Sequence, residues 1–308
     1  MELGLAGLGR MGANMARRMR RGNIDVIAWN RSPQVTQELA DECAVKAAQS
    51  LSELITHLPS PRILWLMLPA GAVTQQAIDE ALPLLAPGDI LVDGANSNYK
   101  DSQKRAAAIA GSGVHYVDAG VSGGVWGLEN GYAMMLGGEQ EAIEQLRPAL
   151  EVLAPSPTRG WLHCGPVGSG HFVKMIHNGI EYGMMQAYAE GFSLLKGKQE
   201  FDLDLGSIAE MWRHGSVVRS WLLDLTRDFL VDDQQLDQVE AVVADSGEGR
   251  WTALEGIEQG IPTPVMSLAL MMRFSSQGGS DFSAKMLAKM RQGFGGHALA
   301  EKPESSRG

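Results

Sequence analysis

Seven short apolar runs alternate with helical patterns over the first 165 residues, and this alternation limits the possible folds more than any other feature. The runs are residues 3–7, 25–30, 62–68, 89–94, 114–120, 133–138 and 161–165. Strands that alternate with helices predict βαβ units and a mostly parallel sheet. We therefore predict an α/β fold whose amino-terminal part is a doubly wound, Rossmann-type domain.

Strand signals nearly vanish after Gly165, and helical patterns take their place. We predict helices over 170–197, 205–230, 234–245 and 263–276. The Gly/Pro-rich stretch GPVGSG (165–170) separates the two patterns, as loops between domains often do. The sequence thus predicts a dinucleotide-binding domain over 1–165 and an all-α domain over 166–290.

A glycine-rich motif follows the first predicted strand and opens a helix. The pattern GxGxxG is weak by itself, but this strand–helix context is the one in which it binds a dinucleotide. The alternative is a tight turn without a ligand. We predict that the pyrophosphate of a cofactor binds at Gly7, Leu8, Gly9, Arg10, Met11 and Gly12.

The end of the second strand indicates which dinucleotide binds. NAD enzymes usually carry a carboxylate there for the ribose 2′-hydroxyl, whereas NADP enzymes place an arginine nearby. This chain has Asn30, Arg31 and Ser32 and no carboxylate. We predict NADP as the preferred cofactor, with NAD possible; the alternative is that Arg31 is an ordinary solvated arginine.

Three more loops are predicted to end at the same edge of the sheet. Leu68 closes the third apolar run and is assigned to the cofactor site. Asn96 follows the fourth run, where it could reach both nicotinamide and substrate, although Asp93 or Asn96 could instead cap the next helix. The bare backbone of Ser122-Gly123-Gly124 could bind a carboxylate, and the alternative is a flexible turn.

The predicted helix over 170–197 carries an unusual polar stripe. Its members follow the spacing i, i+3, i+4, i+7 and i+8, so they share one face: Lys174, His177, Asn178, Glu181 and Tyr182. A partly desolvated lysine can act as a base near neutral pH, and a buried carboxylic acid can act as a proton donor. We expect this face to be the floor of a cleft between the two domains. The alternative is a Lys–Glu pair on a solvated helix.

Composition excludes several classes of protein. The formal net charge is −10, so we expect no nucleic-acid partner. No apolar run is long enough to span a membrane, and no His, Cys, Asp or Glu cluster has metal-ligand spacing. The first residues, MELGLAGLG, lack the features of a signal peptide, and Cys43 and Cys164 are not arranged like a disulfide framework. We expect a cytoplasmic protein without a metal.

Four segments together resemble decarboxylating 6-phosphogluconate dehydrogenase, a branch of the β-hydroxyacid dehydrogenases, in its short bacterial form. They are GLAGLGRMGANMARR (4–18), DGANSNYKDS (93–102), DAGVSGGVWGLENG (118–131) and GHFVKMIHNGIEYGMMQ (170–186). The resemblance implies that Lys174 accepts the 3-hydroxyl proton and that Glu181 protonates C1 after CO2 leaves, giving ribulose 5-phosphate. It assigns substrate contacts to Asn96, Ser122, Gly123, Gly124, His177, Asn178 and Tyr182.

The same resemblance assigns the substrate phosphate to arginines. It places one contact at Arg273, but the family's lysine is missing from SGEGRW (246–251), where Arg250 could compensate. RQGFGGH (291–297) resembles the family's tail, so Arg291 and His297 would reach a partner subunit from a tail over 291–308. This implies a homodimer or homotetramer with shared active sites.

Two other functions stay open at this stage. One is a related dehydrogenase that acts on an unphosphorylated 3-hydroxy acid without decarboxylation. The other is a nucleotide-binding sensor without catalytic activity.

Overall fold

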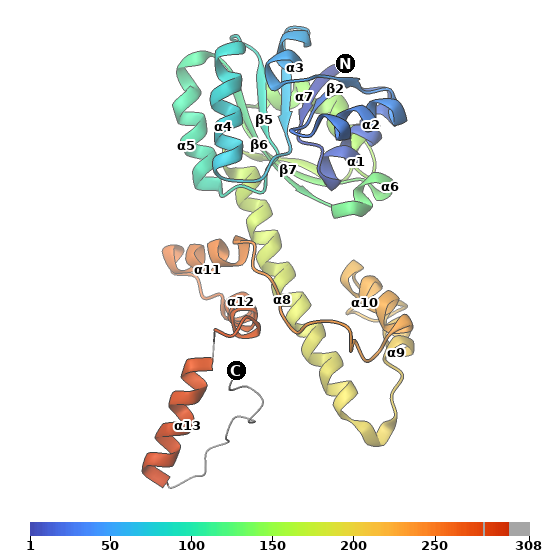
Figure 1. The fold of residues 1–308 in the computed structure, drawn as a ribbon, viewed down its shortest axis with the longest axis vertical. Coiled ribbons are helices and arrows are strands. Elements are labelled where there is room, and N and C mark those ends of the chain that lie inside the picture. The colour runs from blue at the N-terminus through green and yellow to red at the C-terminus, as the bar shows by residue number, and fades with distance from the viewer. Residues whose placement is uncertain (280, 296–308) are drawn as a thin grey trace. The chain divides into compact units, whose positions relative to one another are not determined.

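A computed structural model describes residues 1–279 and 281–295 (Figure 1). Contacts divide the chain into two compact units, residues 1–177 and 178–308. This division falls inside a long helix, after His177, whereas the sequence places the domain boundary at 165–170. The first unit holds every strand in the described ranges, and the second is helical.

The first unit is built on one eight-stranded sheet of order β3-β2-β1-β4-β5-β6-β7-β8. Strands β1 to β6 are mutually parallel, β7 is antiparallel to β6, and β8 is parallel to β7. The predicted α/β, doubly wound architecture is thereby confirmed. The strands are β1 (Glu2–Ala6), β2 (Asp25–Trp29), β3 (Lys46–Ala47), β4 (Ile63–Leu66), β5 (Ile90–Asp93), β6 (His115–Ser122), β7 (Ala133–Gly137) and β8 (Trp161–Gly165).

Helices cover both faces of this sheet, as Figure 1 shows. Neighbouring strand residues point to opposite faces, so Ile63 and Trp65 enter one core while Leu64 and Leu66 enter the other. Helices α1, α2 and α7 cover the first core, and α3, α4 and α5 cover the second. The helices before the long helix are α1 (Arg10–Arg21), α2 (Pro33–Cys43), α3 (Leu51–His57), α4 (Ala72–Ala81), α5 (Tyr99–Ile109), α6 (Gly127–Asn130) and α7 (Gln140–Leu153).

Helix α8 (Ser169–Gly197) begins in the first unit and matches the prediction of a helix over 170–197. The helices that follow α8 are α9 (Leu205–Arg213), α10 (Trp221–Asp232), α11 (Glu248–Gln259), α12 (Pro264–Ser276) and α13 (Asp281–Gly295). Short 3₁₀ segments lie at 82–84, 110–112, 124–126 and 199–201.

The prediction of a helix over 234–245 is wrong. Its apolar residues have helical spacing, but the side chains of Val239 and Val242 are 67% and 59% exposed. A short helix needs a packed apolar face to be stable, and this segment has none within the described residues.

Helices α11 and α13 are the helices that the sequence did not predict. Gly249 and Gly256 in α11 are both packing positions. A Cβ at Gly249 would lie 2.5 Å from the Tyr182 ring, and one at Gly256 would lie 2.8 Å from the Thr263 hydroxyl.

None of the helices described is long and apolar enough to cross a membrane.

Candidate active site

The glycine motif forms a tight βα turn at the end of β1. Gly7 has φ of +99°, and a Cβ there would lie 2.4 Å from the Met67 carbonyl oxygen. A Cβ at Gly12 would lie 2.1 Å from the Gly7 carbonyl oxygen, so the turn and α1 pack too closely for a side chain. A Cβ at Gly9 would meet nothing within 4 Å. Gly9 therefore leaves open space beside the backbone, where a ligand can approach.

The amino terminus of α1 suits an anion. Within the described residues, no side chain caps this end of α1, and its first turn holds no acidic residue. Uncapped N–H groups and the helix dipole favour a negative charge at such a position. Arg10 is exposed at the first position of α1, while Leu8 is buried and Met11 packs against the core. This geometry fits the pyrophosphate of a dinucleotide.

The end of β2 braces the glycine turn. The Asn30 side chain accepts a hydrogen bond from Leu8 N over 3.1 Å, so its oxygen is already used inside the protein. Arg31 and Ser32 are both exposed, and no carboxylate side chain follows β2 directly. A ribose 2′-phosphate would meet a cation at this position rather than an acid.

Leu68 and Asn96 lie in the loops that follow β4 and β5. A Cβ at Gly7 would lie 2.9 Å from Leu68 Cδ2, so Leu68 is close to the glycine turn. Asn96 is exposed. The sequence allows Asp93 or Asn96 to cap α5, but Asn98 is the residue that does so, accepting a hydrogen bond from Lys100 N over 2.9 Å. Asp93 is fully buried and serves another purpose, because it binds Arg105 over 2.8 Å.

The loop after β6 carries the second glycine pair. Ser122 ends β6, and Gly123 and Gly124 have φ of +137° and +53°, which side chains disfavour. Because β1, β2, β4, β5 and β6 are parallel, their carboxyl ends share one edge of the sheet. The topology thus brings the predicted residues of these five loops to one edge, which is where ligands bind in such sheets.

The first turn of α8 is held by a carboxylate that sequence reasoning missed. Asp118 on β6 is fully buried, and it accepts hydrogen bonds from Gly168 N over 2.6 Å and His171 N over 2.8 Å. Burial raises the pKa of the Asp118 carboxyl group. The spacing of DAG (118–120) gave no sign of this role, because the partners lie about 50 residues further along the chain.

Lys174 is the next residue that this anchoring positions. A Cβ at Gly120 would lie 2.4 Å from Lys174 Cβ, so the lysine stem packs directly on the bare backbone of β6. Lys174 Nζ lies 3.5 Å from His177 Nδ1, and both side chains are half-buried. Lys174 therefore lies against the part of β6 that leads to Ser122.

The remaining residues of the polar stripe belong to the second unit. Asn178 and Glu181 are half-buried, and the Tyr182 side chain is 6% exposed. The Tyr182 ring packs against Gly249, and the Arg273 guanidinium lies 3.4 Å from its centre. In the described part of the chain the Tyr182 hydroxyl has no hydrogen-bond partner, which suits a group that meets a polar ligand.

The arginines predicted to bind a phosphate differ in their surroundings. Arg273 on α12 donates to the Ala244 carbonyl over 2.9 Å. Arg250 is paired with Asp245 and stacks on Phe274 at 4.3 Å, so its side chain is already engaged. Arg291 is exposed on α13, and His297 lies outside the described residues.

Glu248 is a buried acidic residue that the sequence patterns did not indicate. It is buried at the start of α11 and accepts a hydrogen bond from Ser246 over 2.6 Å.

The described residues contain no group of three His, Cys, Asp or Glu side chains that could hold a metal ion.

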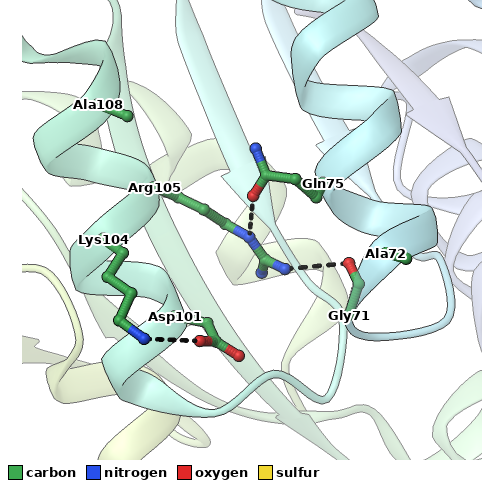
Figure 2. Close-up of a pocket in the computed structure, with 7 residues that line it drawn as sticks. All are labelled: Gly71, Ala72, Gln75, Asp101, Lys104, Arg105 and Ala108. Atoms are coloured by element: carbon green, nitrogen blue, oxygen red, sulfur yellow. Dashed lines mark hydrogen bonds and ion pairs between the residues drawn. The ribbon is translucent and has the colours of Figure 1, made fainter.

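A pocket of about 300 Å³ lies between α4 and α5 (Figure 2). None of the predicted ligand residues lines it. Its lining residues are Gly71, Ala72, Gln75, Asp101, Lys104, Arg105 and Ala108.

The fold and the glycine turn define the first unit as a dinucleotide-binding domain of the Rossmann class. Comparison with known proteins gives the family. Residues 2–164 match the NAD binding domain of 6-phosphogluconate dehydrogenase, and residues 170–302 match the 6-phosphogluconate dehydrogenase C-terminal domain. The chain therefore belongs to the 6-phosphogluconate dehydrogenase family.

Individual relatives agree with this assignment. The chain is 40% identical over 305 residues to an NAD(+)-dependent, decarboxylating 6-phosphogluconate dehydrogenase of Haloferax volcanii, covering 99% of this chain and 100% of the relative. It is 35% identical to the NADP(+)-dependent, decarboxylating enzyme of Bacillus subtilis, covering 89% of this chain but 61% of that longer protein. The structure of Plasmodium falciparum 6-phosphogluconate dehydrogenase matches 99% of this chain and 67% of its own, with 30% identity and a TM-score of 0.83.

The open space beside Gly9 leads to a prediction. Gly9→Val should fold normally, because a Cβ there meets nothing, but its side chain should occupy the space left for the pyrophosphate. We expect the Kd for NADPH to rise about tenfold or more, with little change in Tm. Fluorescence titration measures the Kd, and Gly111→Val, at another uncrowded glycine, is the matched control. An unchanged Kd in the Gly9 variant would contradict this placement of the cofactor.

Proposed function

We propose that the chain catalyses the NAD(P)-linked oxidative decarboxylation of 6-phospho-D-gluconate to D-ribulose 5-phosphate and CO2. The observation that carries this proposal is the match of both halves of the chain to 6-phosphogluconate dehydrogenase, together with a decarboxylating relative that aligns over its full length. The polar stripe of α8 supplies the residue types that the two proton transfers need.

The cofactor would bind along the carboxyl edge of the sheet. The glycine turn and the first turn of α1 would hold the pyrophosphate, and Arg31 with Ser32 would hold the adenosine ribose or its 2′-phosphate. We propose NADP as the preferred cofactor, with NAD as a possible substitute. Relatives of both kinds are known, since the Haloferax enzyme is NAD(+)-dependent and the Bacillus enzyme NADP(+)-dependent. When bound, the nicotinamide supplies the hydride acceptor.

Lys174 is the proposed base of the oxidation. Its stem packs on Gly120 and its amine lies near His177, so the amine is held in place and is partly shielded from water. It would accept the proton of the 3-hydroxyl while hydride leaves C3. The resulting β-keto acid then loses CO2 from C1.

Glu181 is the proposed acid of the final step. It lies seven residues after Lys174 in one continuous helix, so the two residues are about two turns apart on the same face. Glu181 would donate a proton to C1 of the enediol. His177, Asn178 and Tyr182 would bind the substrate's hydroxyl groups, and Asn96 with the Ser122–Gly124 loop would bind its carboxylate end.

The substrate phosphate would bind to arginines. Arg273 is the proposed contact within one subunit, since its guanidinium is fixed on the Tyr182 ring and is only partly buried. Arg291 and His297 would come from the partner subunit.

We propose a homodimer, which could pair into a homotetramer, because the helical unit exposes large apolar side chains. Leu194, Ile257 and Val265 are 77%, 77% and 68% exposed, and a second copy would cover such surfaces. The proposed location is the cytoplasm, where both cysteines would stay reduced.

Turnover of two substrates tests this function. The purified chain should reduce NADP with 6-phosphogluconate and should be at least about a hundredfold less efficient with gluconate, because a fully used phosphate contact is worth several kcal/mol. The measurement is kcat/KM from the absorbance of the reduced cofactor. Equal values for the two substrates would favour a relative that acts on an unphosphorylated 3-hydroxy acid.

Two variants on α8 test the assignment of the base and the acid. Lys174→Met and Glu181→Gln should each lower kcat by about 10²-fold or more, because each removes a proton-transfer group. Lys196→Met and Glu190→Gln are matched controls on the same helix, and both should keep kcat within about twofold of the wild type. An unchanged kcat in either site variant would refute the role of that residue.

Arg31 tests the cofactor preference. Arg31→Ala should lower kcat/KM for NADP about tenfold or more and should leave the value for NAD nearly unchanged, because only NADP carries the 2′-phosphate. Arg159→Ala, at another exposed arginine of the first unit, should change neither value. A wild-type chain that strongly prefers NAD, with the same preference in Arg31→Ala, would contradict the assignment.

A further inference from the structure

The guanidinium of Arg105 on α5 is almost completely buried. It is hydrogen-bonded to two loops of the proposed cofactor site. One of its nitrogens, Nη1, donates to Asp93 Oδ2 over 2.8 Å and to Ser97 Oγ over 3.0 Å. Ser97 directly follows Asn96 in the loop between β5 and α5, residues 94–98. These bonds therefore tie Arg105 to the loop that carries Asn96.

The same side chain also binds the loop between β4 and α4, residues 67–71. Arg105 Nη2 donates to the Gly71 carbonyl over 3.2 Å, and Arg105 Nε donates to Gln75 Oε1 over 3.1 Å. Figure 2 shows both bonds reaching across from α5 to the start of α4. This loop carries Leu68, which lies beside the glycine turn.

Asp93, at the end of β5, forms the ion pair that fixes the guanidinium. Its carboxylate is fully buried and accepts hydrogen bonds from the Tyr116 hydroxyl over 2.7 Å and from Ala95 N over 3.1 Å. Burial, and then the Asp93 charge, raise the pKa of Tyr116, so this phenol stays protonated and donates. A buried charge pair with its hydrogen bonds satisfied is rigid.

We infer that Arg105 is a positioning residue that fixes the spacing of these two loops, and thereby places Leu68 and Asn96 around the nicotinamide end of the cofactor. This inference rests on the proposed function. Only arginine offers a planar fork whose donors reach both loops and Asp93 at the same time. Lysine could keep the charge beside Asp93 but would not span the remaining acceptors.

The alternative is that Arg105 only stabilises the fold, and the same strand offers a matched control. Asp89 directly precedes the first residue of β5, is also buried and forms an ion pair with Arg62 over 3.2 Å. Asp89 also accepts hydrogen bonds from the backbone N–H groups of Arg62 and Ala86. This pair lies at the amino end of the parallel strands, away from the predicted ligand loops, so it should contribute to stability alone.

The experiment compares Arg105→Lys and Arg105→Gln with Arg62→Lys and Arg62→Gln in the full chain. Fluorescence titration gives the Kd for NADPH, and thermal unfolding gives the Tm. We expect both Arg105 variants to raise the Kd about tenfold, with Arg105→Lys close to the wild-type Tm because it keeps the ion pair. Arg62→Gln should lower the Tm, Arg62→Lys should stay close to the wild-type Tm because it also keeps its ion pair, and both should keep the Kd within about twofold of the wild type.

A third variant keeps the test decisive if an Arg105 variant does not fold. Gln75→Ala removes a partly exposed partner of Arg105 at the start of α4, and it should raise the Kd about threefold without loss of fold. Unchanged Kd values in the folded Arg105 variants and in Gln75→Ala would overturn the inference, as would an equal rise in the Arg62 variants.

The cofactor readout is separate from the test of the proposed function. A wild-type chain that binds NADPH but leaves 6-phosphogluconate unchanged would refute the function alone. The Kd ratios between the Arg105 and Arg62 variants would still decide the role of Arg105.

Discussion

Two hydrogen bonds to one buried carboxylate, one from the first turn of α8 and one from the residue before it, determine where the proposed catalytic lysine lies. Asp118 accepts from Gly168 N and His171 N, and such bonds to a charged group contribute about 1.5–3 kcal/mol each. They seat the helix on β6, so that Lys174 packs on Gly120, two residues before the Ser122 loop. The sheet thus supplies both the cofactor loops and the anchor of the helix that carries the base.

In α8 the polar stripe is the more buried side of the helix and the apolar side is the more exposed one, whereas an ordinary surface helix buries its apolar side. Glu181 and Tyr182 are half-buried and buried, whereas Ile180 and Met184 are 51% and 39% exposed in the single chain. A helix with this pattern keeps its polar side chains away from bulk water. Its apolar side chains are stable only when another protein surface packs against them. This is the pattern that we expect of a helix used both for catalysis and for association, and it agrees with the proposed homodimer.

The sequence predicted the sheet well because both of its faces are buried. Such strands read as continuous apolar runs, so seven of the eight strands stood out, while β3 has two residues and left no pattern. The antiparallel pairing of β7 depends on tertiary contacts and could not be read from periodicity. In the second unit, the sequence predicted a helix over 234–245 that does not form, and it did not predict α11 or α13. Apolar spacing does not show whether a partner surface exists, and packed glycines look like loop glycines.

Candidate site residues could be proposed from the sequence where a short motif has a local mechanism. The glycine turn, Arg31 and the stripe of α8 follow from spacing along a strand–helix junction or along one helix. Asp118 and Arg105 were not predictable, because Asp118 binds Gly168, 50 residues further on, Arg105 binds Gly71, 34 residues earlier, and neither belongs to a periodic pattern. Both support elements of the proposed site, and sequence patterns indicate residues in a local motif more readily than the residues that hold such a motif in place.

The central claim is that this chain couples oxidation to loss of CO2. The most direct measurement uses 6-phosphogluconate labelled with ¹³C at C1 and compares released ¹³CO2 with reduced cofactor in the same reaction. We expect one labelled CO2 for each NADPH formed. Formation of NADPH without labelled CO2 would contradict it, because the chain would then be a simple alcohol dehydrogenase of the same superfamily.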